Sequence, residues 1–296
     1  MKNRKVQRYV GFVVKNDIIN AGMSTTGYKH SKVILNMARF GCIRDKFDQR
    51  DYLMRAYLPL KKLPIRIDWR QEMSPVRDQG VEGTCVGFAT AIGMKEYQEM
   101  LDYQKLVGLS PRFVYTEAKK IDGMPRLEGT TIRASMKVLK KKGVCQEKFW
   151  PYQPHQKDKP LSGAFSNAKK FCIMTYARIL NLDELRMSLV TKGPAVLGID
   201  VFKGIITTKT GIVPLPKKGE RSIGGHAICA VGYDDKNKLV KFKNSWSVRW
   251  GDRGYGYLPF EYVRRYMMDA WSSVDIDDPN PLTLASVLNY QKKALV

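Results

Sequence analysis

The sequence is poor in histidine and in acidic residues, and it contains no long apolar run. Only 3 histidines occur in 296 residues, and 28 Asp and Glu stand against 51 Lys and Arg, which gives a formal charge of +23. No apolar run approaches the ~20 residues that a membrane-spanning helix needs, which argues against a helical membrane protein. Because 44 % of the residues are apolar, we expect a globular chain with one large domain or two lobes.

The cysteines are few, odd in number and widely spaced, so they do not resemble a disulfide scaffold. No C-x-x-C pair and no zinc-ligand spacing is found. The first 16 residues carry only a short apolar stretch, at 9–14, and no convincing cleavage site for a signal peptide. We therefore expect reduced thiols and a cytoplasmic location. The five cysteines are Cys42, Cys85, Cys145, Cys172 and Cys229.

Several motifs of common enzyme classes are missing. The sequence has no G-x-x-x-x-G-K-[ST], no H-E-x-x-H, no G-x-S-x-G and no G-x-G-x-x-G after a strand. Nucleotide hydrolysis, zinc proteolysis, serine hydrolysis and dinucleotide binding therefore lack their usual sequence features. We expect no cofactor and no metal ion.

The N-terminal region is the most basic part of the chain. Residues 1–70 hold 16 Lys and Arg against 5 Asp and Glu. This excess predicts an acidic partner or a polyanion for residues 1–63, although a solvated basic face explains it equally well; nucleic acid is not expected as a specific ligand. A short strand at Val10–Val14, a short helix at Ser31–Phe40 and an extended connector at Leu60–Leu63 are predicted there.

Helical signals dominate the next part of the chain. Apolar spacing predicts a buried helix over Cys85–Leu106, with Thr84 as its N-cap. Gly87 and Gly93 cost roughly 1 kcal/mol each inside a helix relative to Ala, so we expect close packing there. Further helices are predicted at 111–119 and 132–142, followed by a loop at 151–160 that is the best candidate for a lobe boundary.

Strand signals follow this loop. Short apolar runs bounded by Gly, Asp or Asn predict strands at 195–201, 225–233 and 239–244, and glycines at 251, 254 and 256 predict a turn and a strand. Helices followed by strands favour an α+β fold with two lobes side by side.

Two residues combine reactive chemistry with a suitable position. His226 opens an apolar strand after two glycines, whereas His30 and His155 lie in polar regions. A lone buried histidine is more often a hydrogen-bonded core residue, but the glycines favour close approach of a ligand. Cys85 could be a small buried hydrophobe. At the first turn of a helix, however, the dipole lowers the pKa of a thiol, and an imidazole could then hold the proton.

A series of motifs surrounds these two residues in a set order. His226 lies 141 residues after Cys85, Asn244 lies 18 after His226, and Gln79 lies 6 before Cys85. The motifs are Asp68-Trp69-Arg70, Ser74–Gly80, Gly83-Thr84-Cys85, Leu109-Ser110-Pro111, Gly225-His226-Ala227, Lys243–Trp246 and Trp250–Gly256. Over about residues 66–270 the chain resembles the papain-like cysteine peptidases, and it is most similar to their microbial branch.

The resemblance implies a two-lobe fold, with a helical lobe, a β-barrel-like lobe and the active-site cleft between them. It implies that Cys85 is the nucleophile and His226 the acid and base. Asn244 would orient the imidazole, as the third member of such a triad does, and Gln79 would donate to the oxyanion. The substrate-binding residues implied are Gly83, Gly129 and Trp246, with Trp246 also shielding the Asn244–His226 contact from water.

The chain departs from the family pattern at several positions. Glu82 replaces the usual Cys three residues before the nucleophile, which removes a disulfide and predicts a carboxylate at the cleft rim. Val86 replaces the usual aromatic residue, and Ser247 stands where Gly is common. Residues 1–63 are shorter than the usual inhibitory propeptide and lack its helical signature, so a propeptide, an arm that wraps the lobes and a partner-binding segment stay open.

The predicted organisation has three parts. They are the basic extension 1–63, a peptidase domain 64–270 with a helical lobe (about 64–155) and a β lobe (about 156–270), and a tail 271–296. The predicted activity is endopeptidase hydrolysis of peptide or protein substrates. An aminopeptidase or acyl-transfer enzyme with the same site is the first alternative, and a non-catalytic binding protein of this fold is the second.

Overall fold

The computed structural model describes residues 40–57, 62–156 and 158–275. The strand predicted at 10–14, nearly all of the helix predicted at 31–40 and part of the connector at 60–63 lie outside these residues.

The α-helices are α2 (Cys85–Phe88), α3 (Glu96–Tyr103), α4 (Pro111–Lys119), α5 (Ile132–Lys141), α6 (Ala164–Ala168), α7 (Leu182–Thr191), α8 (Lys203–Thr207) and α9 (Phe260–Tyr266). The strands are β1 (Arg66–Asp68), β2 (Ile173–Ile179), β3 (Ala195–Val201), β4 (Gly224–Asp234), β5 (Leu239–Lys243), β6 (Tyr255–Pro259) and β7 (Met267–Asp275). A π-helix, η3 (Ala89–Lys95), joins α2 to α3, and 3₁₀ turns lie at η1 (Met54–Tyr57), η2 (Arg70–Glu72), η4 (Glu147–Phe149) and η5 (Lys169–Phe171).

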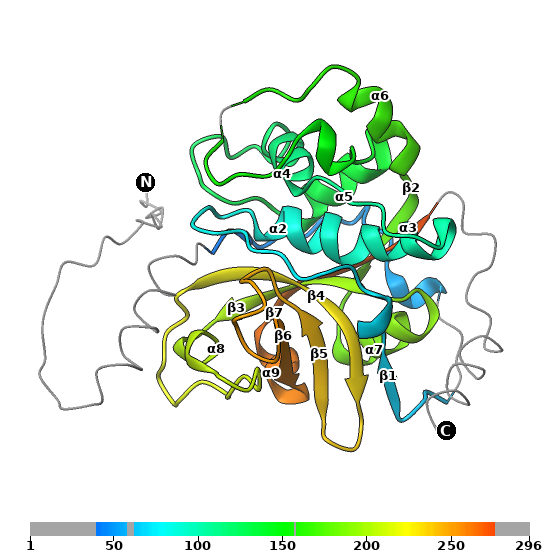
Figure 1. Ribbon diagram of the computed structural model, residues 1–296. Helices are drawn as coiled ribbons and strands as arrows, with labels where there is room; N and C mark the ends of the chain where they lie inside the picture. Colours follow the sequence, from blue (N-terminus) through cyan, green and yellow to red (C-terminus); the bar gives the residue numbers. More distant parts are fainter. Residues whose placement is uncertain (1–39, 58–61, 157, 276–296) are drawn as a thin grey trace, which may run out of the picture.

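The two sides of the molecule differ in secondary structure. Helices α2 to α6 gather on one side, and strands β3 to β6 form the other (Figure 1). The strands make one antiparallel sheet in the order β2-β7-β3-β4-β5-β6, with β1 added to β4. The α+β prediction is confirmed. No helix in the described part of the chain is long and apolar enough to cross a membrane.

The helix that begins at Cys85 matches its prediction, except that it ends at Tyr103 instead of Leu106 and differs in two local features. The segment from Cys85 to Tyr103 is helical throughout, but Ala89–Lys95 winds as a π-helix between two α-helical parts. Thr84 lies at the N-cap position, as predicted, but its side chain makes no capping hydrogen bond. Its hydroxyl lies 2.7 Å from the Tyr152 hydroxyl instead, so a tertiary contact replaces the local one.

The two glycines of this helix pack closely against neighbouring segments, as predicted. A Cβ at Gly87 would lie 2.6 Å from the Pro111 carbonyl oxygen, and one at Gly93 would lie 2.5 Å from the Cβ of Cys229 in β4. The backbone of the π-helix at Gly93 therefore packs directly against the Cys229 side chain of the sheet. This contact sets the distance between the helical lobe and the strand that carries His226.

The three predicted strands are all present, and none of their ends differs from the prediction by more than one residue. Strand β3 has its predicted bounds, β4 is longer by one residue at each end, and β5 is shorter by one residue at its C-terminal end. Strand β7 continues to Asp275 and pairs with β2 and β3. Trp271, at the centre of this strand, is fully buried. The sheet thus extends five residues beyond position 270, where the tail was predicted to begin.

We expect the substitution Gly93→Ala to destabilise the protein by about 1–3 kcal/mol, because the added methyl group overpacks the contact with Cys229. Helix propensity alone predicts the opposite sign, a gain of about 1 kcal/mol. Urea unfolding measures the difference. A stabilised variant would contradict the close contact between η3 and β4.

Candidate active site

His226 and Asn244 come from adjacent antiparallel strands. His226 lies near the start of β4 and Asn244 directly follows β5, and the pairing of Cys229 with Lys243 brings the two ends together. His226 Nε2 and Asn244 Oδ1 lie 2.8 Å apart. The indole of Trp246 stacks on the imidazole at 4.5 Å between ring centroids. The amide and the indole together fix the plane of the His226 ring.

Cys85 lies beside this pair at the first residue of α2. Its Sγ accepts a hydrogen bond of 3.4 Å from the backbone N–H of Ala227, the residue after His226. The other ring nitrogen of His226, Nδ1, is buried and has no hydrogen-bond partner among the described residues. The thiol therefore lies between helix and sheet, in contact with the residue that follows His226.

Gln79 is fully buried and held at both ends of its amide. Its Oε1 accepts from the Ser245 hydroxyl at 2.6 Å, and its Nε2 donates to the Glu82 carbonyl at 2.9 Å. The backbone N–H of Gln79 also donates to the Ser245 carbonyl at 2.9 Å. Ser245, two residues before Ser247, thus ties the Gln79 loop to the Asn244 segment. Ser247 has a φ of 61°, which explains why glycine is common at its position.

Residues Gly41 to Ile43 lie across the space between the two lobes. The N–H of Thr130 donates to the Gly41 carbonyl, and the N–H of Ile43 donates to the Thr130 carbonyl, at 2.9 and 3.0 Å. On the opposite side the N–H of Cys42 donates to the Gly225 carbonyl at 3.0 Å. This short extended segment bridges both lobes next to Cys85 and His226.

Gly83 and Gly129, the two glycines predicted to contact substrate, contact this segment. A Cβ at Gly41 would lie 1.8 Å from the Gly83 carbonyl oxygen, and one at Gly129 would lie 2.4 Å from the Gly41 carbonyl oxygen. Gly129 also has a φ of 91°, which disfavours any other residue. Three glycines from distant parts of the chain therefore meet backbone to backbone.

Side chains on both sides of Gly41 fill the cleft. The Phe40 ring packs against His226 and Trp246, with centroids 6.4 and 6.1 Å apart. Cys42 is buried, and its Sγ would lie 3.0 Å from a Cβ at Gly198. Phe40 therefore covers the imidazole of His226, and the Cys42 side chain packs on the sheet at Gly198.

The segment is anchored by a buried ionic network just beyond the cleft. The backbone N–H of Asp45 donates to Asp269 at 2.7 Å, and the Asp45 carboxylate accepts from the Trp271 indole at 3.1 Å. Asp51 accepts two hydrogen bonds from Arg133, at 2.9 and 2.5 Å. Buried ion pairs break only at substantial cost, so residues 45–51 fix the position of Gly41.

The covered site holds its reactive groups in their neutral forms. Burial raises the pKa of the Cys85 thiol to about 11, despite hydrogen bonds from the backbones of Ala227 and Gly41. Burial also lowers the pKa of His226 to about 4, although the bond to Asn244 opposes this shift. The thiolate expected from the helix dipole is not favoured here, because exclusion of water outweighs the dipole.

Glu82 differs from its prediction. It is buried rather than exposed at the cleft rim, and its carboxylate pairs with the Arg112 guanidinium at 2.5 Å. A carboxylate in this position needs a cation to compensate for its lost hydration. Nothing in the local sequence around Glu82 indicates which cation supplies it.

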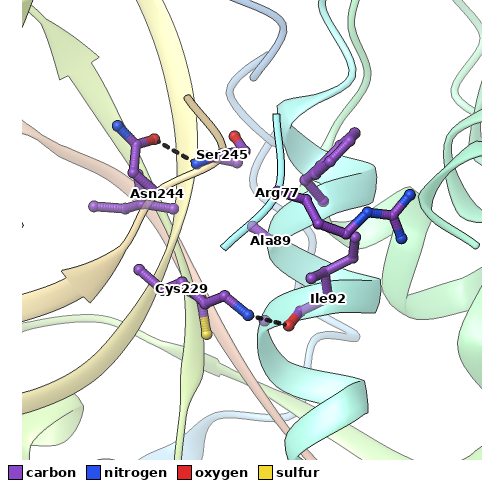
Figure 2. Close-up of a pocket in the computed structure, with 11 residues that line it drawn as sticks. Arg77, Ala89, Ile92, Cys229, Asn244 and Ser245 are labelled. Atoms are coloured by element: carbon purple, nitrogen blue, oxygen red, sulfur yellow. Dashed lines mark hydrogen bonds between the residues drawn. The ribbon is translucent and has the colours of Figure 1, made fainter. Parts of the chain in front are cut away.

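A separate pocket lies along the seam between η3 and the sheet, beside Asn244 (Figure 2). Residues such as Arg77, Ile92 and Cys229 line it, whereas Cys85 and His226 do not. The buried Lys243 Nζ donates there to the Ser74 and Ile92 carbonyls, at 2.7 and 3.0 Å. This pocket is part of the lobe interface and not the substrate cleft. Within the described residues, no group of three or more His, Cys, Asp or Glu side chains could hold a metal ion.

The structure brings together all the site residues predicted from sequence: Cys85, His226, Asn244, Gln79, Gly83, Gly129 and Trp246. The sequence analysis did not identify Phe40, Gly41 or Arg112 as site residues. Phe40 and Gly41 lie more than 15 residues from any predicted site residue, and Arg112 lies in a predicted helix where no motif marks it. Ser245 could have been identified from the sequence, because it belongs to the same motif as Asn244. None of the five cysteines is in a disulfide bond.

We expect alkylation of Cys85 by iodoacetamide in the full chain to rise with pH up to about 11, because only the thiolate reacts and burial raises the thiol pKa to that value. Mass spectrometry of the Cys85 peptide after short pulses between pH 6 and 10 measures the rate. The half-buried Cys172 gives an internal reference for the reagent. If the alkylation rate of Cys85 no longer rose above a pH lower than 8, the thiol would already be ionised there, and the raised pKa would be contradicted.

Comparisons with known proteins agree with this geometry. Residues 63–269 match the papain family of cysteine proteases. An uncharacterized peptidase C1-like protein of Acanthamoeba polyphaga mimivirus is 32 % identical over 81 % of this chain and 88 % of its own length. Cathepsin S of Bos taurus is 29 % identical over 67 % of this chain and 60 % of its own length.

Solved structures show the same fold. Xylellain, a cysteine protease from Xylella fastidiosa, superposes with a TM-score of 0.71 at 30 % identity, over 80 % of this chain and 96 % of that one. Digestive procathepsin L 3 of Tenebrio molitor superposes with a TM-score of 0.62 at 21 % identity, over 84 % of this chain and 79 % of that one. The chain belongs to the papain family and is a cysteine peptidase with the papain-like two-lobe fold.

Proposed function

We propose that this peptidase is an endopeptidase that uses Cys85, His226 and Asn244, with Gln79 as an oxyanion donor. The observation that carries the proposal is the convergence of the Cys85 thiol, the His226–Asn244 pair and the Gln79 amide between helix and sheet. A thiol next to an oriented imidazole is the arrangement that nucleophilic catalysis requires.

The reaction follows from the roles of these groups. When the cleft opens, water and substrate relieve the burial that keeps the site neutral, and His226 takes the proton of Cys85. The Cys85 sulfur then attacks the peptide carbonyl carbon, and the carbonyl oxygen gains negative charge that the Gln79 amide stabilises. His226 gives its proton to the leaving amine, and a water molecule hydrolyses the thioester with His226 as base.

Two groups keep His226 in the orientation that these proton transfers need. Asn244 Oδ1 accepts from Nε2, which leaves Nδ1 as the nitrogen on the side of the thiol. Trp246 covers this hydrogen bond from water, which strengthens it in a medium of lower dielectric constant. Neither residue reacts with substrate.

We expect the Cys85→Ala variant to lose both hydrolysis of a denatured protein substrate and labelling by an epoxysuccinyl probe, because no other group supplies the nucleophile. Peptide products are identified by mass spectrometry of an N-terminally blocked peptide mixture. Internal cleavage of blocked peptides by the wild type supports an endopeptidase. Cleavage restricted to free N-termini would show an aminopeptidase, and residual hydrolysis in the variant would remove Cys85 from the reaction.

We infer that the N-terminal extension inhibits the enzyme through Phe40–Ile43. Of the alternatives for residues 1–63, the hydrogen bonds of this segment to both lobes favour inhibition. The backbone of Gly41 also interacts with the Cys85 thiol and lowers its pKa, so this segment lies against the proposed nucleophile.

We expect Gly41→Ala to raise the initial rate of peptide hydrolysis and of Cys85 labelling in the full chain at least tenfold, because its methyl group would lie 1.8 Å from the Gly83 carbonyl oxygen and displace the segment. The matched control is Gly108→Ala, where a Cβ meets nothing within 4 Å. Equal rates in wild type and Gly41→Ala would refute inhibition by this segment.

A further inference from the structure

Glu82 and Arg112 form a buried, two-pronged ion pair just outside the cleft. Arg112 Nη1 donates to Glu82 Oε1 at 2.9 Å, and Nη2 donates to Oε2 at 2.5 Å. The exposed fractions of the two side chains are 9 % and 4 %. The backbone N–H of His155 completes the carboxylate with a bond of 2.7 Å to Oε2. Three charge-assisted hydrogen bonds fix this carboxylate in both position and plane.

Arg112 connects the pair to a second loop. Nη2 also donates to the Gln153 carbonyl at 2.5 Å, and the guanidinium lies 4.9 Å from the centre of the Tyr152 ring. Arg112 itself is in α4, between Pro111 at the helix start and the rest of the helical lobe. A rigid helix therefore holds both the Glu82 loop and the 152–155 loop.

Both loops lead directly to Gln79. The backbone carbonyl of Glu82 accepts from Gln79 Nε2 at 2.9 Å, and the Tyr152 hydroxyl donates to the Gln79 carbonyl at 2.7 Å. One connection reaches the side-chain amide and the other reaches the backbone. A shift of the Glu82 loop would move the amide nitrogen that is placed to stabilise the oxyanion.

We propose that the Arg112–Glu82 ion pair positions Gln79 for oxyanion stabilisation. The proposal rests on the proposed function, because it needs Gln79 to act as the donor. The usual family residue at position 82 is a disulfide-forming Cys, and the ion pair anchors the same loop without one. Misplacement of a catalytic group by about 1 Å can cost ~10²-fold in rate, so a directional anchor on this loop has a catalytic consequence.

The test compares turnover with alkylation in the full chain. We expect Glu82→Gln to lower kcat for peptide hydrolysis at least tenfold, with KM changed less than twofold. The rate of Cys85 alkylation by iodoacetamide should stay within twofold of the wild type, because alkylation forms no oxyanion. A general loosening of the cleft would change KM and alkylation as well, and that result would overturn the proposal.

A double-mutant cycle shows whether the pair acts through Gln79. In a Gln79→Ala background, we expect Glu82→Gln to lower kcat by less than twofold, because the group that it positions is already gone. A further tenfold loss in that background would show that the ion pair acts on another part of the site and would refute the proposal.

Two further variants separate catalysis from folding. Asp122→Asn removes a buried carboxylate of the same lobe that pairs with Lys119 at 2.8 Å, and it should leave kcat unchanged. If Glu82→Gln does not fold, the neutral pair Glu82→Gln/Arg112→Met replaces it with the same expected loss of kcat. A folded neutral pair with wild-type kcat would overturn the proposal. Failure of the proposed function is recognised separately, as wild-type turnover that persists in Cys85→Ala.

Discussion

The contact between the π-helix η3 and strand β4 controls the geometry of the site. Cys85 lies at one end of the helical segment and His226 at one end of the strand. At Gly93 the two elements approach so closely that a single methyl group would overlap Cys229. Lys243 holds the same seam by donating to the carbonyl of Ile92. The separation of thiol and imidazole therefore depends on packing well away from the reacting atoms.

The sequence predicts the site well because its motifs carry the reactive residues. Cys85, His226 and Asn244 stand in motifs whose order and spacing identify them, and the apolar runs around them predict their helix and strands. Phe40 and Gly41 could not be predicted in the same way. Their position depends on hydrogen bonds to Thr130 and Gly225, which lie far away in sequence and follow no local periodicity. Thr84 illustrates the same limit, since Tyr152 takes the hydroxyl that local rules assign to a cap.

Acidic side chains are buried more often than basic ones in this protein. Among the described residues, seven acidic side chains but only four basic ones are buried. Acidic groups such as Asp45, Glu82 and Asp269 are used inside the fold, where they hold loops and the N-terminal segment in place. The surface of the described part is therefore more basic than its overall composition indicates. This surface excess is independent of the catalytic groups, none of which is a lysine or an arginine.

The meeting of Gly41, Gly83 and Gly129 restricts how this protein can change by mutation. A side chain at Gly41 or Gly129 would overlap a carbonyl oxygen of another of the three, and a Cβ at Gly83 would lie 3.2 Å from the Cα of Gly41. A clash with a side chain can be relieved by shortening that side chain, but a clash with a carbonyl oxygen cannot. Second-site suppressors of a substitution at Gly41 should therefore not arise at Gly83 or Gly129. They should arise instead where the whole segment can shift, such as the salt bridges of Asp45 and Asp51.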